Sequence, residues 1–211
     1  MSRPALFDLD GTLVDLAAPR DDLEALRAGL RALAEREGVP LDHFGIFPMY
    51  RALSVAGRGV AEARELIDSY EVRWARATAR ALTSDDALGR LLASGAPVAL
   101  VTSNGRACVR ALREAGLLPG AFPVEITRDE CGLLKPDPEP VRRAVTALGD
   151  VADGDELPFV GDSKADREAV AAYARVWGRP PVRFVPVREG TGAVEPARSI
   201  DAVLADLAGT S

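Results

Sequence analysis

Apolar positions recur at helical spacing in three successive stretches near the start of the chain. In the first, 21–37, leucines return every three or four residues, and a glycine and a proline follow the run. The second stretch spans 44–56 and the third runs from about 60 to 81. The stripe expected to face the interior in the third stretch comprises Ala63, Ile67, Tyr70, Trp74, Ala77 and Ala81. This region is therefore predicted to be mainly helical.

The rest of the chain alternates between short apolar runs and amphipathic stretches. The predicted strands are 4–10, 97–101, 122–126, 157–160 and 182–187, and the predicted helices are 85–94, 105–115, 137–148, 164–174 and 199–208. Such alternation indicates a parallel sheet with helices on both faces. We therefore expect an α/β fold, a Rossmann-like parallel sheet core with a small all-α cap inserted after the first strand. The core would comprise 1–14 and 82–211, and the cap 15–81, with hinges near 15–19 and 81–85.

Composition and charge restrict the function classes. Apolar residues make up 47% of the chain and charged residues 27%, which is typical of globular domains. The net charge of −6 and the pI near 5.0 argue against nucleic-acid binding, which needs a basic face. We found neither a long apolar run nor a signal peptide, so we expect a cytoplasmic protein without membrane contact, as a monomer or homodimer. The single histidine, His43, disfavours Ser-His-Asp chemistry and multi-histidine zinc sites.

Two carboxylates stand at the C-terminal end of the first predicted strand. Asp8 and Asp10 stand two residues apart, before the turn-forming pair Gly11-Thr12. Residues two apart on a strand point the same way, and burying both charges would cost several kcal/mol without a compensating cation or hydrogen-bond donors. Mg²⁺ prefers oxygen ligands and would supply that compensation. The alternatives are solvated acids in a strand-end turn and the DxD metal site of a sugar transferase, which this N-terminal position fits badly.

Three further motifs follow later strands or loops. Thr102-Ser103-Asn104 comes directly after a strand, where a hydroxyl and free amides could bind an anion or simply cap a helix. Lys135 is one of only two lysines and precedes a proline, so it could project an ammonium into a site or be a solvated loop residue. Asp162 and Asp166, in the sequence GDSKAD, are one helical turn apart and could face one point or cap a helix.

Taken in order, these motifs resemble those of the haloacid dehalogenase-like superfamily. The resemblance consists of DxDGT at 8–12, a strand-terminal Thr102, Lys-Pro at 135–136 and GDSxxD at 161–166. The helical insertion after the first strand is similar to the phosphoglycolate phosphatase-like and β-phosphoglucomutase-like branch. The resemblance implies a Mg²⁺-dependent phosphatase that hydrolyses a small phosphorylated metabolite.

The resemblance also implies a role for each motif residue. Asp8 would be the nucleophile that forms an aspartyl-phosphate, and Asp10 would act first as general acid and then as general base. Mg²⁺ would be held by Asp8, the Asp10 backbone carbonyl and Asp162. Thr102 and Lys135 would complete the catalytic set by holding and neutralising the phosphoryl group. The remaining implied positions are Gly11, Thr12, Ser103 and Asn104 at the substrate, and Ser163 and Asp166 behind the site, where Asp166 would orient Lys135 or a metal-bound water.

Related activities can be weighed on the same residues. A dehalogenase lacks the second Asp of the first motif, so Asp10 counts against it, and a phosphonate-cleaving enzyme needs a cap lysine, which 15–81 does not contain. A sugar-phosphate mutase shares the catalytic core and stays open, as does a non-catalytic phosphate-binding protein. Substrate choice is expected to rest on cap residues Arg20, His43, Arg51 and Arg58. Arg58 is the first candidate because it lies between two glycines and arginine suits carboxylate or phosphate groups.

Overall fold

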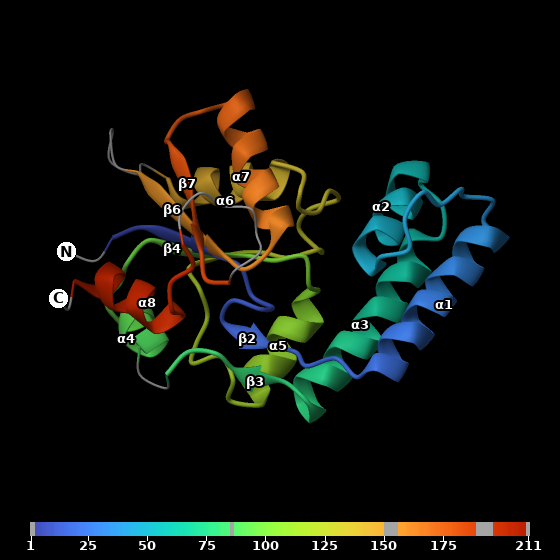
Figure 1. The fold of residues 1–211 in the computed structure, drawn as a ribbon, viewed down its shortest axis with the longest axis horizontal. Coiled ribbons are helices and arrows are strands. Elements are labelled where there is room, and N and C mark those ends of the chain that lie inside the picture. Colours follow the sequence, from blue (N-terminus) through green and yellow to red (C-terminus); the bar gives the residue numbers. More distant parts are fainter. Residues whose placement is uncertain (1–2, 85–86, 150–155, 189–195, 210–211) are drawn as a thin grey trace.

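The computed structural model describes residues 3–84, 87–149, 156–188 and 196–209. Its centre is a five-stranded parallel sheet in the order β5-β4-β1-β6-β7 (Figure 1). The strands are β1 (Ala5–Phe7), β4 (Val98–Val101), β5 (Val124–Ile126), β6 (Leu157–Gly161) and β7 (Val182–Pro186). The predicted α/β class and parallel sheet are confirmed. Because β1 is central, the residues that follow it lie between those that follow β4 and β6.

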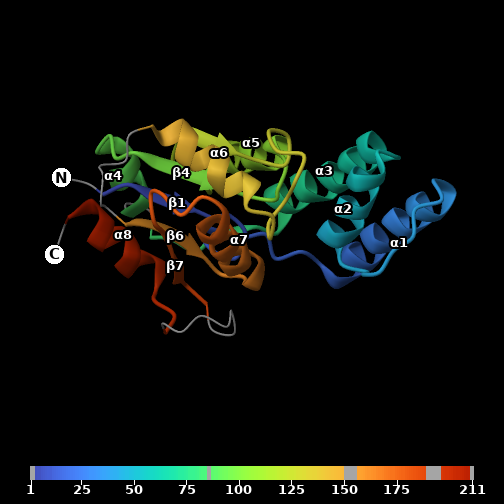
Figure 2. The ribbon, with the colours of Figure 1, turned by 90° about the horizontal axis from the view of Figure 1, so that it is seen from above.

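Helices cover both faces of the sheet, as the apolar strands predicted. On one face lie α6 (Glu139–Leu148) and α7 (Lys164–Val176), and on the other α4 (Ala87–Ala93), α5 (Arg106–Glu114) and α8 (Ile200–Ala208) (Figure 2). Phe7 packs in one core and its neighbour Leu6 in the other. Successive strand residues point to opposite faces, so every buried strand needs apolar side chains throughout.

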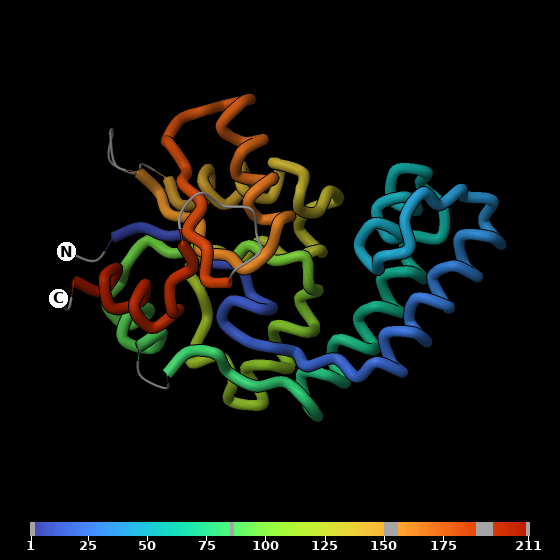
Figure 3. Tube along the Cα trace, viewed as in Figure 1, coloured from blue at the N-terminus to red at the C-terminus, as the bar shows by residue number. Residues whose placement is uncertain are grey.

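Three helices lie beside the carboxyl ends of the strands. They are α1 (Arg20–Arg36), α2 (Ile46–Ala56) and α3 (Val60–Ala77), and together they are named the helical insertion below (Figure 3). They pack against one another through Leu26, Leu30, Met49, Leu53, Ala63 and Ile67. The position of the helical insertion agrees with the predicted cap, whereas the boundaries at 14/15 and 81/82 and the hinges stay predictions.

A small antiparallel ladder joins the two ends of this segment, and the sequence pattern did not reveal it. It consists of β2 (Val14–Asp15) and β3 (Arg80–Ala81). The third helix, predicted to continue to about 81, ends at Ala77, because the Thr78 hydroxyl donates to the Leu16 carbonyl at 2.9 Å and β3 pairs with β2. Ala77 and Ala81 are exposed, so they do not belong to the buried stripe that periodicity predicted.

Other predicted elements differ at their ends. The first strand ends at Phe7 and not near residue 10, and the strand predicted from 122 begins at Val124. The helix predicted over 85–94 is described from Ala87 onward, and the loop predicted over 188–196 lies mostly outside the described residues. Within the described ranges, no helix combines the length and apolarity needed to span a membrane.

Candidate active site

The carboxyl ends of β1, β4 and β6 carry the predicted chemical groups at one edge of the sheet. Asp8 follows β1, and its amide donates to the Val160 carbonyl at 2.9 Å, so the ladder extends one residue beyond the strand. Asp162 follows β6 directly, and the turn at 102–105 follows β4. Ligand sites of open parallel sheets form at this edge, since loops leave the strands there. The topology thus brings together residues that are far apart in the sequence.

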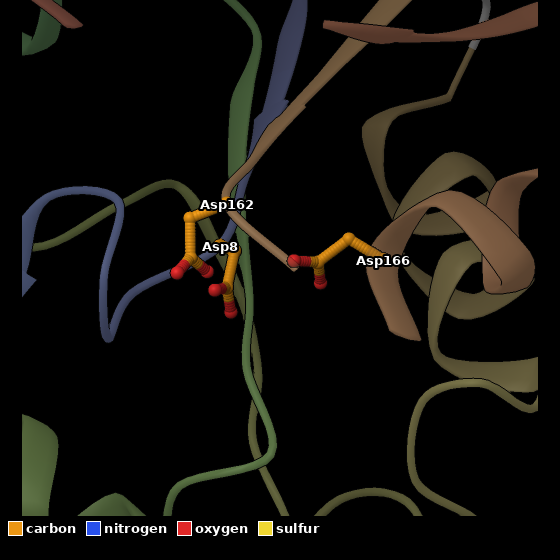
Figure 4. A group of neighbouring side chains, drawn as sticks. All are labelled: Asp8, Asp162 and Asp166. Atoms are coloured by element: carbon orange, nitrogen blue, oxygen red, sulfur yellow. The ribbon is translucent and has the colours of Figure 1, made fainter. Parts of the chain in front are cut away.

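Three carboxylates form an acidic cluster at this edge (Figure 4). Oxygen atoms of Asp8, Asp162 and Asp166 lie within 4.8 Å of one another. Asp8 and Asp166 are buried and Asp162 is half-buried. Burial, then the Asp166 charge, raises the pKa of Asp162, and burial raises the pKa of Asp8 to about 8, with Asp166 adding to the rise and Lys135 opposing it. Burial is thus the larger cause of both rises, and the neighbouring Asp166 carboxylate adds to each.

Gly11 and Thr12 shape the cluster. Gly11 has φ +84°, and an added Cβ would lie 2.1 Å from Oδ2 of Asp162. Only glycine therefore allows the Asp162 carboxylate its position. Thr12 is buried, and its hydroxyl lies 3.5 Å from Oδ2 of Asp8. Both predicted residues thus border the carboxylates, and neither is among the residues that line the cleft described below.

Lys135 places its ammonium among these carboxylates. Nζ forms ion pairs with Oδ1 of Asp8 and, at 2.6 Å, with Oδ1 of Asp166, and it donates to the Val101 carbonyl at 3.0 Å. Burial alone would lower the pKa of this ammonium, but Asp166 and Asp8 outweigh burial and raise it above its ordinary value. Lys135 therefore stays charged, and its charge neutralises only part of the acidic cluster.

Asp166 is occupied on both oxygens. Its Oδ1 faces Lys135, and its Oδ2 accepts from the Ser163 hydroxyl at 2.6 Å and the Ser163 amide at 3.0 Å. The Ser163 hydroxyl in turn accepts from the Asp166 amide, which completes a capping box at the start of α7. Asp166 therefore both caps α7 and pairs with Lys135, as the two sequence interpretations predicted. Asp166 also does not line the cleft described below, unlike Asp8 and Asp162.

Asp10 differs from Asp8 in its exposure, and β1 ends before both residues. The Asp10 side chain reaches solvent, and its Oδ1 accepts from the Leu16 amide at 3.0 Å. Surrounding atoms still displace part of its water, and this desolvation raises the pKa of Asp10 to about 6. The hydrogen bond from Leu16 lowers this pKa, and the Asp162 charge raises it further. The expectation that two strand carboxylates would share one buried face is therefore wrong. Asp10 is instead exposed, and it lines the cleft together with Asp8.

The turn after β4 has an internal hydrogen-bond network. The Thr102 hydroxyl donates to Oδ1 of Asn104 at 2.8 Å and accepts from the Asn104 amide at 3.1 Å. Ser103 and Asn104 line the cleft, whereas Thr102 does not. The next helix begins at Arg106 with Gly105 as its N-cap, so none of the three predicted residues is the N-cap.

A cleft of about 920 Å³ lies between the acidic cluster and the helical insertion. Asp8, Asp10, Lys135 and Asp162 border it on the sheet side, and His43 and Arg51 are among the residues on the other side. Arg58 is not among the lining residues. Its Nη1 donates to the Glu37 carbonyl at 3.2 Å, so it serves the end of α1. Arg20 pairs with Glu24 on the surface. The two-glycine setting of Arg58 therefore gives a helix-end contact and not a side chain that reaches the cleft.

The model of one protein family matches most of the chain. The haloacid dehalogenase-like hydrolase model matches residues 5–173, which include the motifs at 8–12, 102–104, 135–136 and 161–166. The chain belongs to the haloacid dehalogenase-like hydrolases. The resemblance inferred from the ordered motifs is confirmed.

Curated relatives of this hydrolase are phosphoglycolate phosphatases. One from Yersinia pseudotuberculosis is 33% identical over 180 residues, which cover 81% of this chain and 77% of the relative. One from Rhodospirillum rubrum is 30% identical over 202 residues, or 86% of this chain and 79% of the relative. With the family match, they confirm the predicted enzyme class, a phosphoric monoester hydrolase.

Solved structures share the fold of this hydrolase at lower identity. A protein assigned as a phosphoglycolate phosphatase from Lactobacillus plantarum has TM-score 0.59 at 19% identity, covering 98% of this chain and 99% of that one. CbbY from Rhodobacter sphaeroides, solved with phosphate, has TM-score 0.57 at 19% identity, covering 93% and 90%. A protein assigned as β-phosphoglucomutase from Thermotoga maritima has TM-score 0.57 at 20% identity, covering 99% and 100%. These likenesses show the fold.

The donor set of the hydrolase fits a hard divalent cation. Three carboxyl groups within 4.8 Å of one another offer only oxygen atoms. The cations beside them are Lys135, at Asp8 and Asp166, and Arg188, whose Nη1 lies 3.6 Å from Oδ2 of Asp162. Mg²⁺ prefers such oxygen ligands and would reduce the remaining repulsion. Asp8 and Asp162 line the cleft and Asp166 does not, so Asp8 and Asp162 are the side chains that a cation in the cleft would meet.

Behind the cleft, a buried arginine joins the helical insertion to the turn after β4. Arg128, in the loop after β5, has 0% of its surface exposed. Its Nη1 donates to Oε1 of Glu71 at 3.0 Å and to the Ser103 carbonyl at 2.8 Å, and its Nη2 donates to Oε2 of Glu71 at 2.9 Å and to Asp68. Glu71 and Asp68 belong to α3, so the two parts of the molecule share one buried ion-pair group.

The same group holds the backbone and side chain of the turn. Glu71 also accepts from Nδ2 of Asn104 at 3.0 Å and from the Gly105 amide at 2.9 Å. A Cβ at Gly105 would lie 2.2 Å from Oδ1 of Asp68, so the close approach requires glycine. Sequence analysis missed Arg128 and Glu71, because both residue types are usually exposed. The available signal was the position of Glu71 between Ile67 and Trp74 on the buried stripe of α3.

Proposed function

We propose that this hydrolase is a Mg²⁺-dependent phosphatase that cleaves small phosphomonoesters through an aspartyl-phosphate on Asp8. The observation that carries the proposal is the Asp8 carboxylate at the cleft, paired with the Lys135 ammonium and crowded by two further carboxylates. A nucleophile in this setting needs cations to approach an anionic phosphoryl group. Asp8 and Asp162 would hold Mg²⁺ with the Asp10 backbone carbonyl, and the bound ion would offset negative charge on the cluster and the phosphoryl oxygens.

The first step transfers the phosphoryl group to the enzyme. An Asp8 oxygen forms a bond to phosphorus while the bond from phosphorus to the leaving oxygen breaks. The protonated Asp10 carboxyl gives its proton to that oxygen, which leaves as an alcohol. Lys135 faces the charge that spreads over the phosphoryl oxygens, and the turn at 102–104 contributes Ser103 and Asn104 on the cleft side.

The second step releases phosphate. Water forms a bond to phosphorus, the Asp10 carboxylate takes a proton from this water, and the bond between phosphorus and the Asp8 oxygen breaks. The pKa of Asp10, raised to about 6, suits both roles, because the carboxyl is partly protonated near neutral pH and can regain the proton in each cycle. Asp166 would keep Lys135 in place through its ion pair, with Ser163 holding Asp166 in turn.

A panel of small phosphomonoesters assayed with Mg²⁺ and with EDTA tests this function. The panel includes 2-phosphoglycolate, because the curated relatives are phosphoglycolate phosphatases. We expect free phosphate from several compounds with Mg²⁺ and none with EDTA. Isomerised sugar phosphate without free phosphate would instead identify a mutase, and no turnover of any compound would identify a binding protein. A cytoplasmic location and a monomeric or homodimeric state stay predictions.

Replacing Asp10 tests whether its carboxyl group donates a proton to the leaving oxygen. We expect Asp10→Asn to lower kcat/KM for alkyl phosphates by about 10²–10⁴-fold, the usual contribution of a general acid. For p-nitrophenyl phosphate, whose leaving group needs no proton, kcat/KM should fall by less than about tenfold. Steady-state assays with both substrates check this, since kcat/KM reports steps up to the first irreversible one. Equal losses for both substrates would contradict the role of Asp10 as general acid.

The affinity for Mg²⁺ should depend on pH through Asp8. Without metal, folding raises the pKa of Asp8 from 3.8 to about 8, so its contribution to stability falls as pH rises between these values. Mg²⁺ must displace this proton to bind the Asp8 carboxylate. We expect the apparent Kd for Mg²⁺ to tighten by up to about tenfold for each unit between pH 6 and 8. Calorimetric titrations at pH 6, 7 and 8 measure it, and a Kd independent of pH would refute the expectation.

A further inference from the structure

The wall of the cleft opposite the acidic cluster is mainly apolar. Apart from Asp42, His43 and Arg51, every residue of the helical insertion that lines the cleft is apolar, and the larger ones are Val39, Leu41, Phe47, Pro48 and Val55. These side chains come from the α1–α2 loop and from α2. The wall thus differs from the sheet side, where carboxylates and an ammonium meet.

Val55 is the side chain of this wall with the most exposed apolar surface, whereas Val39, Leu41 and Phe47 also pack against the core of the molecule. Val55 lies on the last turns of α2, lines the cleft and is 73% exposed. Exposed apolar side chains that gather in a cleft often mark a ligand-binding surface, because covering them releases water. A ligand that extends from the phosphoryl site across the cleft would cover Val55 and its neighbours.

The size of the cleft points to a ligand larger than a two-carbon acid. Its volume of about 920 Å³ lies at the upper end of the range of roughly 300–1,000 Å³ for small-molecule pockets. Phosphoglycolate, for which the curated relatives are named, has a two-carbon acid as leaving group and would leave most of the apolar wall uncovered. Arg51 lies on this wall and forms no ion pair with a described residue, so it could bind the carboxylate of phosphoglycolate. Comparing phosphoglycolate with apolar phosphomonoesters therefore tests which part of the wall the substrate uses.

We infer that the preferred substrates of this phosphatase are phosphomonoesters whose leaving group is apolar and larger than two carbons, seated on Val39, Leu41, Phe47, Pro48 and Val55. The inference rests on the proposed function and adds the substrate class to it. The phosphoryl group would lie at Asp8 and Lys135, and the hydrocarbon part would lie against α2. Burial of this apolar surface would then stabilise the transition state and raise kcat/KM.

A series of n-alkyl phosphates from methyl to hexyl, with Mg²⁺, tests this inference. The leaving alcohols have similar acidity, so differences in kcat/KM report contact with the cleft. We expect kcat/KM to rise by up to about fourfold for each added methylene, the value for complete burial, and hexyl phosphate to exceed 2-phosphoglycolate. A series that changes by less than about twofold overall, or a preference for 2-phosphoglycolate, overturns the substrate class while leaving the phosphatase intact. No phosphate release from any compound overturns the proposed function itself.

Two surface valines provide a matched pair of variants. Val55→Ser removes apolar surface from the cleft wall, and we expect it to lower the ratio of kcat/KM for hexyl to methyl phosphate by about fourfold or more. Val176→Ser is the control, because Val176 is 62% exposed on α7 and does not line the cleft. This control should leave the ratio unchanged. An unchanged ratio in Val55→Ser, or an equal fall in both variants, overturns the assignment of Val55 to the substrate surface.

Discussion

Replacing Asp8 with asparagine is expected to lower kcat by at least about 10⁴-fold, as removal of a nucleophile does in other enzymes that form covalent intermediates. The amide is nearly the same size as the carboxyl but is a poor nucleophile toward phosphorus. The metal-free fold should tolerate it, because Asp8 is already largely neutral below its pKa of about 8 and Lys135 keeps its ion pair with Asp166. Phosphate release and the thermal midpoint in EDTA give the two readouts.

The covalent intermediate gives a second readout for Asp8. Rapid acid quenching of the wild type with substrate should yield protein heavier by one phosphoryl group, and the Asp8→Asn variant should not gain this mass. Asp21→Asn is a suitable control, since Asp21 is an exposed carboxylate in the first turn of α1. It should keep wild-type turnover and the mass increase. Turnover by a folded Asp8→Asn variant within about tenfold of the wild type would exclude Asp8 as the nucleophile.

Arg128→Ala is expected to destabilise the fold by about 3–5 kcal/mol, the usual cost of leaving a buried charge without its partner. The substitution removes both bonds to Glu71 and the bond to the Ser103 carbonyl, and Glu71 keeps only its donors from Asn104 and Gly105. For a chain of this size, the thermal midpoint should fall by on the order of 10 °C. Denaturant unfolding followed by circular dichroism measures the free energy of unfolding.

A surface ion pair gives the comparison for Arg128. Arg36 forms a two-point contact with Glu62 on the helical insertion, but both side chains are more than half exposed. Water screens such pairs, so Arg36→Ala should change stability far less than Arg128→Ala. Equal losses in the free energy of unfolding would show that burial does not make the Arg128 ion pairs more important than surface pairs. A partial recovery in Arg128→Lys would show that the positive charge itself is needed.

The amino-acid sequence determined the fold class and most of the chemical groups at the site. Apolar strands buried on both faces and helices with one apolar face are readable because side-chain direction follows strand and helix periods. Asp8, Lys135 and Asp162 could be singled out because each stands in a short motif. Asp8 is near the end of a predicted strand, Asp162 comes after one, and Lys135 precedes a proline. Once the strands are parallel, their carboxyl ends meet at one edge, so a meeting of Asp8 and Asp162 could be predicted without coordinates. The place of Lys135 beside them was implied only by the family resemblance.

Only the tertiary structure decided which side chains contact one another. It left Asp10 exposed while Asp8 is buried, directed Arg58 to the end of α1, and joined Arg128 to Glu71 across 57 positions of the chain. The β2–β3 ladder likewise depends on two segments that are distant in sequence. The physical reason is that periodicity describes the direction of a side chain within its own element, whereas ion pairs and pocket walls depend on the packing between elements, which no local pattern specifies.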